Sequence, residues 1–251
     1  ESIVESVYNK ENALLKFGLL PNRKTLLVVG GSLGASSINE VIKNNLNAIE
    51  ENGLQLIWQT GKTNEYIYMV AAEKYSNVFV SAFIDDMSAA YTAADFIVSR
   101  SGAMAVAEIC IAKKPALFVP YPHAAEDHQT FNAMSLVNEG AACIVSDKEV
   151  NKKLITTILE VIGDDQKMEQ MKKADPEVAK QVENASPMSE VTKVIESTNI
   201  PLVVGGFLFY FLFGYLLYSS LFAAIGSAVE NTAEAQQFTF IVMLPIILAF
   251  V

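Results

Sequence analysis

Histidine and cysteine are scarce in this sequence, which has two of each among its 251 residues. Their spacing matches none of the Cys and His patterns that bind zinc, and no Ser-His-Asp or Cys-His arrangement indicates a covalent nucleophile. Cys110 and Cys143 lie inside apolar runs. We therefore expect two buried free thiols, which are typical of a reducing compartment.

Basic residues are also few, because 18 Lys and Arg stand against 28 Asp and Glu for a net charge of −10. A nucleic-acid partner is not expected, since neutralising phosphates requires clustered Lys and Arg. The shortage is greatest from Glu183 onward, where Lys193 is the only basic residue. The polar first six residues lack the basic start and apolar core of a signal peptide.

The back of the chain is apolar, and residues 197–229 contain no charged side chain. This run is longer than the ~20 apolar residues that span a bilayer, and a second apolar run covers residues 238–251. We expect residues 183–251 to form a membrane-spanning helical fragment, with a soluble core helix as the less favoured alternative. Lys193 is the only basic residue beside the spans and favours a cytoplasmic front half.

The front of the chain alternates short apolar runs with helix-like stretches. This alternation predicts an α/β domain over residues 21–182, with a Rossmann-like parallel sheet covered on both faces. Residues 1–20 are expected to be a linker with at least one helical turn. In such sheets the ligand binds at the carboxyl ends of the strands. The expected strands cover residues 25–29, 54–58, 78–83, 96–99, 116–119 and 142–145.

Two loops between a strand and a helix contain glycine. Residues 30–34 read GGSLG and residues 99–103 read SRSGA. Glycine allows a ligand close to the backbone, and a helix start offers unpaired N–H groups to phosphate. The spacing of the first loop is neither G-x-G-x-x-G nor that of a P-loop, and a tight strand–helix turn explains it equally well. Two such loops in one sheet favour a diphosphate ligand, whose ribose Glu108 could bind; a solvent-facing Glu108 is the alternative.

A third polar loop follows the fifth expected strand. Residues 120–129 read PYPHAAEDHQ and contain both histidines of the chain, His123 and His128. Hydrogen bonding to a sugar, a catalytic base, and a helix start capped by Asp127 all remain open.

Two pairs of neighbouring carboxylates are poor candidates for a divalent ion, which needs more oxygen ligands. Residues 85–86 are expected to cap a helix that begins at Met87, and residues 164–165 to form an exposed turn.

The front half resembles the C-terminal domain of the peptidoglycan lipid I N-acetylglucosaminyltransferases, the MurG type, over roughly residues 15–180. The resemblance implies half of a GT-B fold, in which this domain holds the donor UDP-N-acetylglucosamine. The stretches that match are VVGGSLGASSIN, FIDDMSAAYTAAD, SRSGAMAVAEI, KKPALFVPYP and DHQTFNA.

By position in these motifs, the resemblance implies a set of residues that contact the donor, including the Ile84 backbone against the uracil edge. The set is Gly31 and Ser32 for the diphosphate or sugar, Ile84 and Met87 for the uracil, Ser101, Gly102 and Ala103 for the phosphates, Glu108 for the ribose, and His128 and Gln129 for the sugar.

The resemblance assigns no catalytic residue to this chain, and no metal or other cofactor. In the family, the catalytic histidine and the site for the lipid-linked muramyl-pentapeptide acceptor belong to an N-terminal domain outside the matched stretch. We therefore expect donor binding without transfer by this chain alone. A nucleotide-sugar-binding module without catalysis is the alternative.

The tail resembles a permease subunit of a type-2 ABC exporter over about residues 184–251. A chimera joined near residues 181–185, or a tethered enzyme, would explain the combination. An exporter fragment whose front half is a bystander is a further alternative. The expected location is the inner membrane, with the donor domain on the cytoplasmic side. The stretches that carry this resemblance are NASPMSE, FLFGYLLYSSLFAAIGSAVEN and AQQFTF.

Overall fold

The computed structural model describes residues 8–31, 34–124, 127–172 and 198–228. The chain divides into two compact units, Glu1–Ser189 and Glu190–Val251. The first unit contains the sheet and the helices that cover it, and the described part of the second is one long helix.

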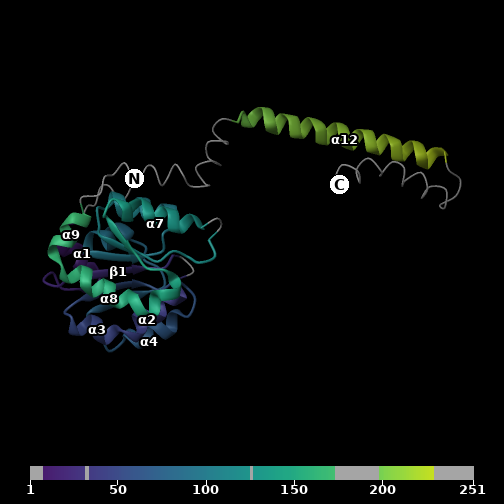
Figure 1. The fold of residues 1–251 in the computed structure, drawn as a ribbon. Coiled ribbons are helices and arrows are strands. Elements are labelled where there is room, and N and C mark those ends of the chain that lie inside the picture. Colours follow the sequence, from purple (N-terminus) through teal and green to yellow (C-terminus); the bar gives the residue numbers. More distant parts are fainter. Residues whose placement is uncertain (1–7, 32–33, 125–126, 173–197, 229–251) are drawn as a thin grey trace. The chain divides into compact units, whose positions relative to one another are not determined.

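A six-stranded sheet in the order β3-β2-β1-β4-β5-β6, with every neighbouring pair parallel, forms the centre of the first unit (Figure 1). The chain adds β2 and β3 on one side of β1 and then crosses to β4 on the other side. The predicted Rossmann-like fold is therefore confirmed. The strands are β1 (Thr25–Val29), β2 (Gln55–Gln59), β3 (Val78–Ser81), β4 (Phe96–Ser99), β5 (Ala116–Phe118) and β6 (Ala142–Ile144).

Helices precede, connect and follow the strands of the first unit. They are α1 (Lys10–Lys16), α2 (Ser36–Asn44), α3 (Leu46–Glu51), α4 (Glu65–Ala72), α5 (Met87–Ala93), α6 (Ala103–Ile111), α7 (His128–Asn138), the 3-10 turn η2 (Asp147–Glu149), α8 (Val150–Gly163) and α9 (Asp165–Met171).

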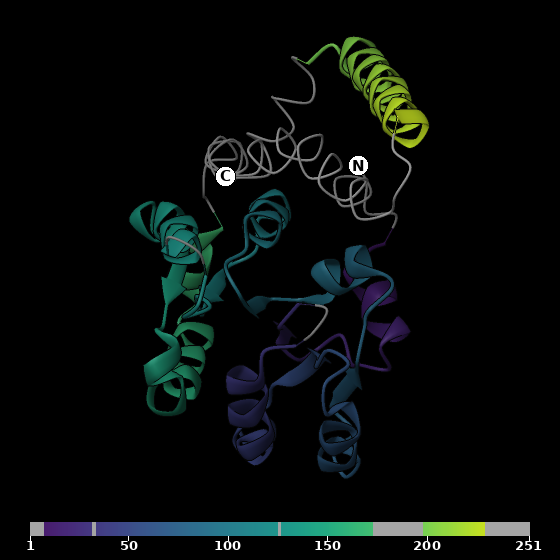
Figure 2. The same cartoon turned by 90° about the vertical axis from the view of Figure 1, so that its right-hand side faces the viewer.

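Alternate residues of each strand enter two separate cores, as the period of two in a strand requires. Leu26 and Val28 of β1 pack with α2, α3, α4 and α8, whereas Leu27 packs with α1, α5, α6 and α7. The helices that pack on these two cores form two layers, one on each side of the sheet (Figure 2). Burial on both faces explains why the strands are continuous apolar runs.

The segment before Pro21 joins the second of these cores. Ala13 and Leu14 of α1 are fully buried. Phe17 meets the ring of Phe79 edge to face, with the ring centroids 5.0 Å apart. Lys16 forms an ion pair with Asp86, and this contact lowers the pKa of the Asp86 carboxyl. The helical turn expected between residues 1 and 20 thus packs against α5 and the sheet.

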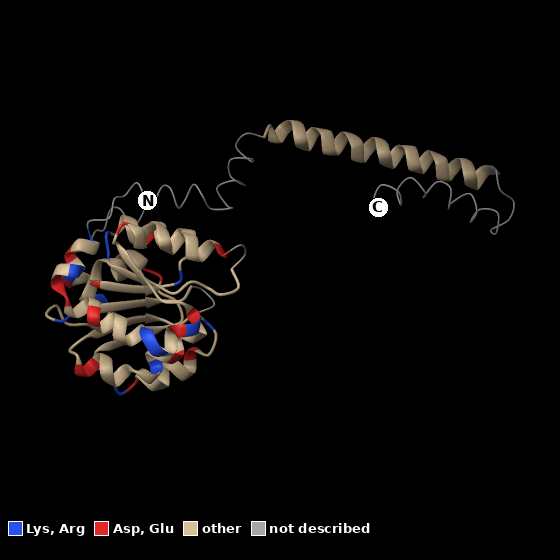
Figure 3. Cartoon of the chain, viewed as in Figure 1, with Lys and Arg blue, Asp and Glu red and all other residues tan. Residues whose placement is uncertain are grey.

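Helix α12 (Ile200–Ala228) forms the described part of the second unit. It contains no charged side chain (Figure 3). Its residues Ile200–Ser227 include an 18-residue window with a mean hydropathy of 2.1, and they are long and apolar enough to cross a membrane. At 1.5 Å per residue this stretch is roughly 40 Å long, more than the hydrocarbon core requires. The expected second span, residues 238–251, and the join near residues 181–185 lie outside the described residues.

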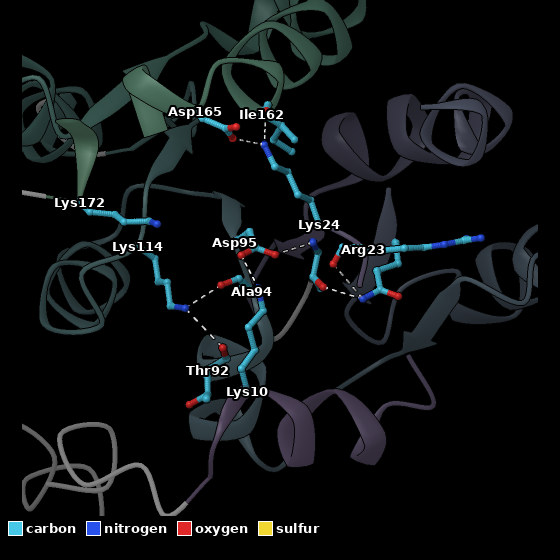
Figure 4. Close-up of polar contacts among 12 residues, drawn as sticks. Lys10, Arg23, Lys24, Thr92, Ala94, Asp95, Lys114, Ile162, Asp165 and Lys172 are labelled. Atoms are coloured by element: carbon cyan, nitrogen blue, oxygen red, sulfur yellow. Dashed lines mark hydrogen bonds and ion pairs between the residues drawn. The ribbon is translucent and has the colours of Figure 1, made fainter. Parts of the chain in front are cut away.

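A polar network closes the sheet at the amino ends of its strands (Figure 4). The Lys24 ammonium donates to the Ile162 carbonyl at 2.7 Å and pairs with Asp165 at 2.5 Å. The Thr25 amide donates to the Asp95 carboxylate at 2.9 Å. The Lys114 ammonium donates to the Ala94 carbonyl at 2.7 Å, just past the end of α5. Burial lowers the pKa of Lys114 to about 8.

Three of the described aspartates stand at helix N-caps, and two of them cap the helix that follows. Asp86 does cap α5, since its Oδ1 accepts from the Ala89 amide at 2.9 Å. Asp164 is exposed as predicted, but it also caps α9 by accepting from the Lys167 amide at 3.0 Å. Asp127 stands at the N-cap of α7 with φ 55°, yet its side chain makes no capping bond to the backbone. Of the three interpretations left open for the loop of residues 120–129, the helix start capped by Asp127 is therefore contradicted.

Neither Cys110 nor Cys143 is part of a disulfide bond among the described residues. Cys110 is buried, whereas Cys143 is only partly buried. Burial raises the pKa of the Cys143 thiol, so this side chain is a weak nucleophile at neutral pH.

Candidate functional site

The two glycine loops begin side by side at the point where the strand order reverses. Val29 is paired with Ser99 at the ends of the neighbouring strands β1 and β4. The residues that follow, Gly30 and Arg100, therefore leave the same edge of the sheet together. In an open parallel sheet, this switch point is where ligands bind.

The loop after β1 is a tight turn with one closed side and one open side. Gly31 and Gly34 both have φ +82°, and the Gly31 carbonyl accepts from the Gly34 amide at 3.1 Å. A Cβ at Gly34 would lie 2.0 Å from the Thr60 carbonyl oxygen, whereas a Cβ at Gly31 would meet nothing within 4 Å. Gly34 is thus required by packing, and Gly31 leaves room beside the loop. Ser32 lies outside the described residues.

Asn39 and Thr60, which the sequence analysis did not single out, form a buried polar contact next to this loop. The Asn39 amide donates to the Thr60 carbonyl at 2.8 Å, and its oxygen accepts from the Trp58 indole at 2.9 Å. Asn39 is almost completely buried. The same Thr60 carbonyl therefore contacts both the loop and the first helix after it.

The two helices that follow the loops begin without a side-chain cap. The N-cap residues of α2 and α6 are Ala35 and Gly102, neither forms a side-chain capping bond, and neither first turn contains an acidic residue. The first N–H groups of both helices are therefore available to an anion, which the helix dipole also favours. A Cβ at Gly102 would meet nothing within 4 Å, so the start of α6 is open.

Ser101 lies beside this helix start with an unpaired hydroxyl. Its side chain is fully buried, and its Oγ has no hydrogen-bond partner in the described part of the chain. Its carbonyl accepts from the Asn132 amide at 3.1 Å, which ties the loop to α7. A buried hydroxyl without a partner is unfavourable, so it is suited to a ligand oxygen.

Arg100 is a structural residue that sequence reasoning missed. Its guanidinium donates to the Val119 and Pro120 carbonyls at 3.1 Å each, to the Asp147 carboxylate at 2.6 Å and to the Ser37 hydroxyl at 3.0 Å. These contacts bind the loops after β4 and β5 to the start of α2 and to η2. The side chain is thus fully engaged in holding the loops in place.

Glu108 is partly buried, and a hydrogen bond from Tyr91 holds its carboxylate in place. Its Oε2 accepts from the Tyr91 hydroxyl at 2.9 Å. Tyr91 is only 4% exposed. Burial, and secondarily the charge of Glu108, raise the pKa of Tyr91, so its hydroxyl stays protonated as a donor. Glu108 is therefore anchored and does not project freely into solvent.

The loop after β3 presents Ile84 and Met87. Ile84 is buried, and its amide donates to the Gln59 side chain at 3.0 Å. A ligand edge read by the Ile84 backbone would therefore have to use the carbonyl rather than the amide. Met87 is partly buried and begins α5.

The loop after β5 leads into α7, which begins at His128. His128 and Gln129 are both partly buried. The Gln129 side-chain oxygen accepts from the Tyr121 amide at 2.9 Å, and its NH2 group has no hydrogen-bond partner among the described residues. The ring of Tyr121 meets that of His123 with centroids 5.6 Å apart. The side-chain amide of Gln129 can therefore donate to a ligand.

All the described candidate residues follow the carboxyl ends of four strands, β1, β3, β4 and β5. The arrangement offers two anion-binding helix starts, a buried hydroxyl and an anchored carboxylate that can accept from hydroxyl groups. In the described part of the chain, no three His, Cys, Asp or Glu side chains form a group that could hold a metal ion. These features suit a phosphorylated ligand with vicinal hydroxyls.

The first unit is similar in sequence to known glycosyltransferases. Residues 25–187 match the family described as the glycosyltransferase family 28 C-terminal domain. The chain is 39% identical to the UDP-N-acetylglucosamine--N-acetylmuramyl-(pentapeptide) pyrophosphoryl-undecaprenol N-acetylglucosamine transferase of Parabacteroides distasonis, over 78% of this chain and 54% of that protein. It is 40% identical to the protein of the same name from Bacteroides thetaiotaomicron, over 79% of this chain and 55% of that protein.

Among solved structures, Acinetobacter baumannii MurG is similar with a TM-score of 0.54 and 27% identity, over 78% of this chain and 55% of that one. The match of residues 25–187 ends before α12 begins, so it lends no support to the exporter resemblance of the tail. The chain spans about half the length of the curated relatives that it matches. Through residues 25–187, the chain belongs to the family of glycosyltransferase family 28 C-terminal domains.

Proposed function

We propose that residues 25–187 bind UDP-N-acetylglucosamine and form the donor-binding half of a peptidoglycan glycosyltransferase. The observation that carries this proposal is the pair of uncapped helix N-termini, α2 and α6, at the switch point between β1 and β4. A diphosphate fits there because both helix starts offer N–H groups and a positive dipole end. The names of the relatives supply the identity of the sugar and nucleotide.

Within this proposal, each group of candidate residues has one part of the donor to bind. The uracil lies against the carbonyl of Ile84 and the side chain of Met87, and the ribose hydroxyls donate to Glu108. The remaining candidates contact the phosphates and the sugar, and they are Gly31, Ser32, Ser101, Gly102, Ala103, His128 and Gln129.

Calorimetric titration of the full chain in detergent tests the assignment directly. We expect saturable binding of UDP-N-acetylglucosamine, and weaker binding of UDP-glucose, because the sugar-binding residues would recognise the acetamido group. Equal affinity for the two sugars would contradict the assignment of the sugar, and binding of neither would contradict the proposal.

Ser101→Ala tests the phosphate contact, because it should preserve or increase the stability of the fold while it weakens UDP binding. Removing an unpaired buried hydroxyl should leave the free energy of unfolding unchanged or raise it by up to about 1 kcal/mol. The same change should weaken UDP binding several-fold and leave uridine binding unchanged. Thr156→Val is a matched control, because that exposed hydroxyl only contacts carbonyls within α8. Equal loss of UDP and uridine affinity would remove Ser101 from the phosphate site.

We further propose that residues 25–187 by themselves bind the donor without transferring the sugar, since an acceptor must also be held and this segment matches about half of each relative. Incubation with donor and a lipid-linked muramyl-pentapeptide should release no UDP. Release of UDP together with a glycosylated lipid would show that the chain is a complete catalyst. Binding without release would also fit a nucleotide-sugar-binding module, and added acceptor-domain protein that restores release would exclude that alternative.

We also propose that α12 anchors the chain in the inner membrane, with the donor domain on the cytoplasmic side. Its length, its hydropathy and the absence of charge support this. Residues 1–182 should then stay in solution without detergent, whereas the full chain should float with liposomes in a density gradient. A full-length chain that remains monomeric in plain buffer would contradict the anchor.

A further inference from the structure

We propose that Tyr91 positions Glu108 for ribose recognition, by fixing one carboxylate oxygen so that the other faces the ribose hydroxyls. The proposal rests on the proposed function, in which Glu108 binds the ribose. Tyr91 itself does not contact the ligand and acts through Glu108.

The Tyr91 side chain is built into the core as a rigid support. It is 4% exposed and belongs to the apolar cluster that also contains Leu27, Ile97 and Val106. Its hydroxyl emerges from this cluster and donates to Glu108 Oε2 at 2.9 Å. A buried phenol needs a partner for its O–H group. The contact therefore holds the Glu108 carboxylate at a position that the core sets.

The second oxygen of Glu108 is the one that can serve a ligand. An ionised carboxylate has two acceptor oxygens, each with room for further hydrogen bonds. Oε1 accepts no hydrogen bond from the side chains and amides that the structure describes. Holding Oε2 removes rotamer freedom that a free glutamate would lose on binding, so the ligand meets a side chain that is already oriented.

The same helix couples the ribose to the base. Met87, which is proposed to lie against the uracil, precedes Tyr91 by four residues in α5. Residues at this spacing lie on the same side of a helix. Helix α5 thus sets the positions of the base contact and, through Tyr91, of the ribose contact on α6.

Tyr91→Phe in the full chain tests the proposal, because it removes only the hydroxyl. The probes are UDP and 2′,3′-dideoxyuridine diphosphate, which lacks both ribose hydroxyls. We expect the Kd for UDP to rise about tenfold and the Kd for the dideoxy analogue to change less than twofold. Tyr66→Phe is the matched control, because Tyr66 is 78% exposed and should leave both constants unchanged.

A purely structural role for Tyr91 would give a different result, since loosening α5 would weaken both ligands equally. Equal weakening, or no weakening of UDP, would overturn the proposal.

Glu108→Gln separates this proposal from the one on which it rests. If Glu108→Gln weakens UDP but not the dideoxy analogue, Glu108 binds the ribose, and an unchanged Tyr91→Phe then overturns only the positioning role. If Glu108→Gln leaves UDP binding intact, the ribose assignment fails and the role of Tyr91 fails with it.

Discussion

Alanine substitutions at Gly31 and Gly34 should have very different costs, although both residues share φ +82° in one loop. Any L-residue at this φ carries the same backbone strain, which is roughly 1–2 kcal/mol. The surroundings differ, because a Cβ at Gly34 would lie 2.0 Å from the Thr60 carbonyl oxygen and one at Gly31 would meet nothing within 4 Å. Comparing the two variants therefore separates the cost of backbone strain from the cost of steric overlap.

The expected magnitudes follow from three contributions. Alanine lowers the entropy of the unfolded chain and so recovers about 0.4–1 kcal/mol at either position. Gly31→Ala should then lower the free energy of unfolding by about 1 kcal/mol or less. Gly34→Ala must also displace the backbone at Thr60, and overpacking of this kind costs about 1–3 kcal/mol more. We expect a total loss of about 1–4 kcal/mol for Gly34→Ala, which is about 1–3 kcal/mol more than for Gly31→Ala.

Trp58 provides the assay, because it is the only tryptophan in the chain. It is fully buried in β2, and its indole donates to Asn39, which also contacts Thr60. Urea unfolding of the full chain in detergent, followed by tryptophan fluorescence, therefore reports on the first unit and not on α12. Equal losses of stability in the two variants would refute the steric argument.

Three further predictions concern residues around the site and the opposite edge of the sheet. Arg100→Ala should lower the free energy of unfolding by about 2–4 kcal/mol, because it leaves the partly buried Asp147 without its ion-pair partner; urea unfolding checks this, and a loss below 1 kcal/mol would contradict it. Glu108→Ala should weaken UDP binding by about 1–3 kcal/mol in calorimetry, and unchanged affinity would remove Glu108 from the site. The pKa of Lys114 falls from 10.5 to about 8 on folding, so between these values the unfolded chain binds more protons and stability should rise with pH by about 1–3 kcal/mol. Lys114→Met should abolish that rise, and parallel pH profiles of the two proteins would show that Lys114 keeps its ordinary pKa.

The local elements of the first unit could be predicted from the sequence alone. The predicted strand at residues 96–99 coincides with β4, because continuous apolar runs between helical stretches mark strands that are buried on both faces. Asp86 was correctly expected to cap α5, since a cap depends only on residues within one turn. The absence of charge in α12 also needs no knowledge of other parts of the chain.

Which of these elements are neighbours could not be predicted from the sequence, because it depends on long-range contacts. The strand order places the loops after β1 and β4 side by side, although Val29 and Ser99 are far apart in the sequence. Tyr91 and Glu108 belong to separate helices, and nothing in the period of either helix marks them as partners. The burial of Ala13 and Leu14 is of the same kind, because a short helix becomes part of a core only when a distant sheet covers it. Periodicity is a local property of a chain, whereas a site at the edge of a parallel sheet is made of long-range contacts.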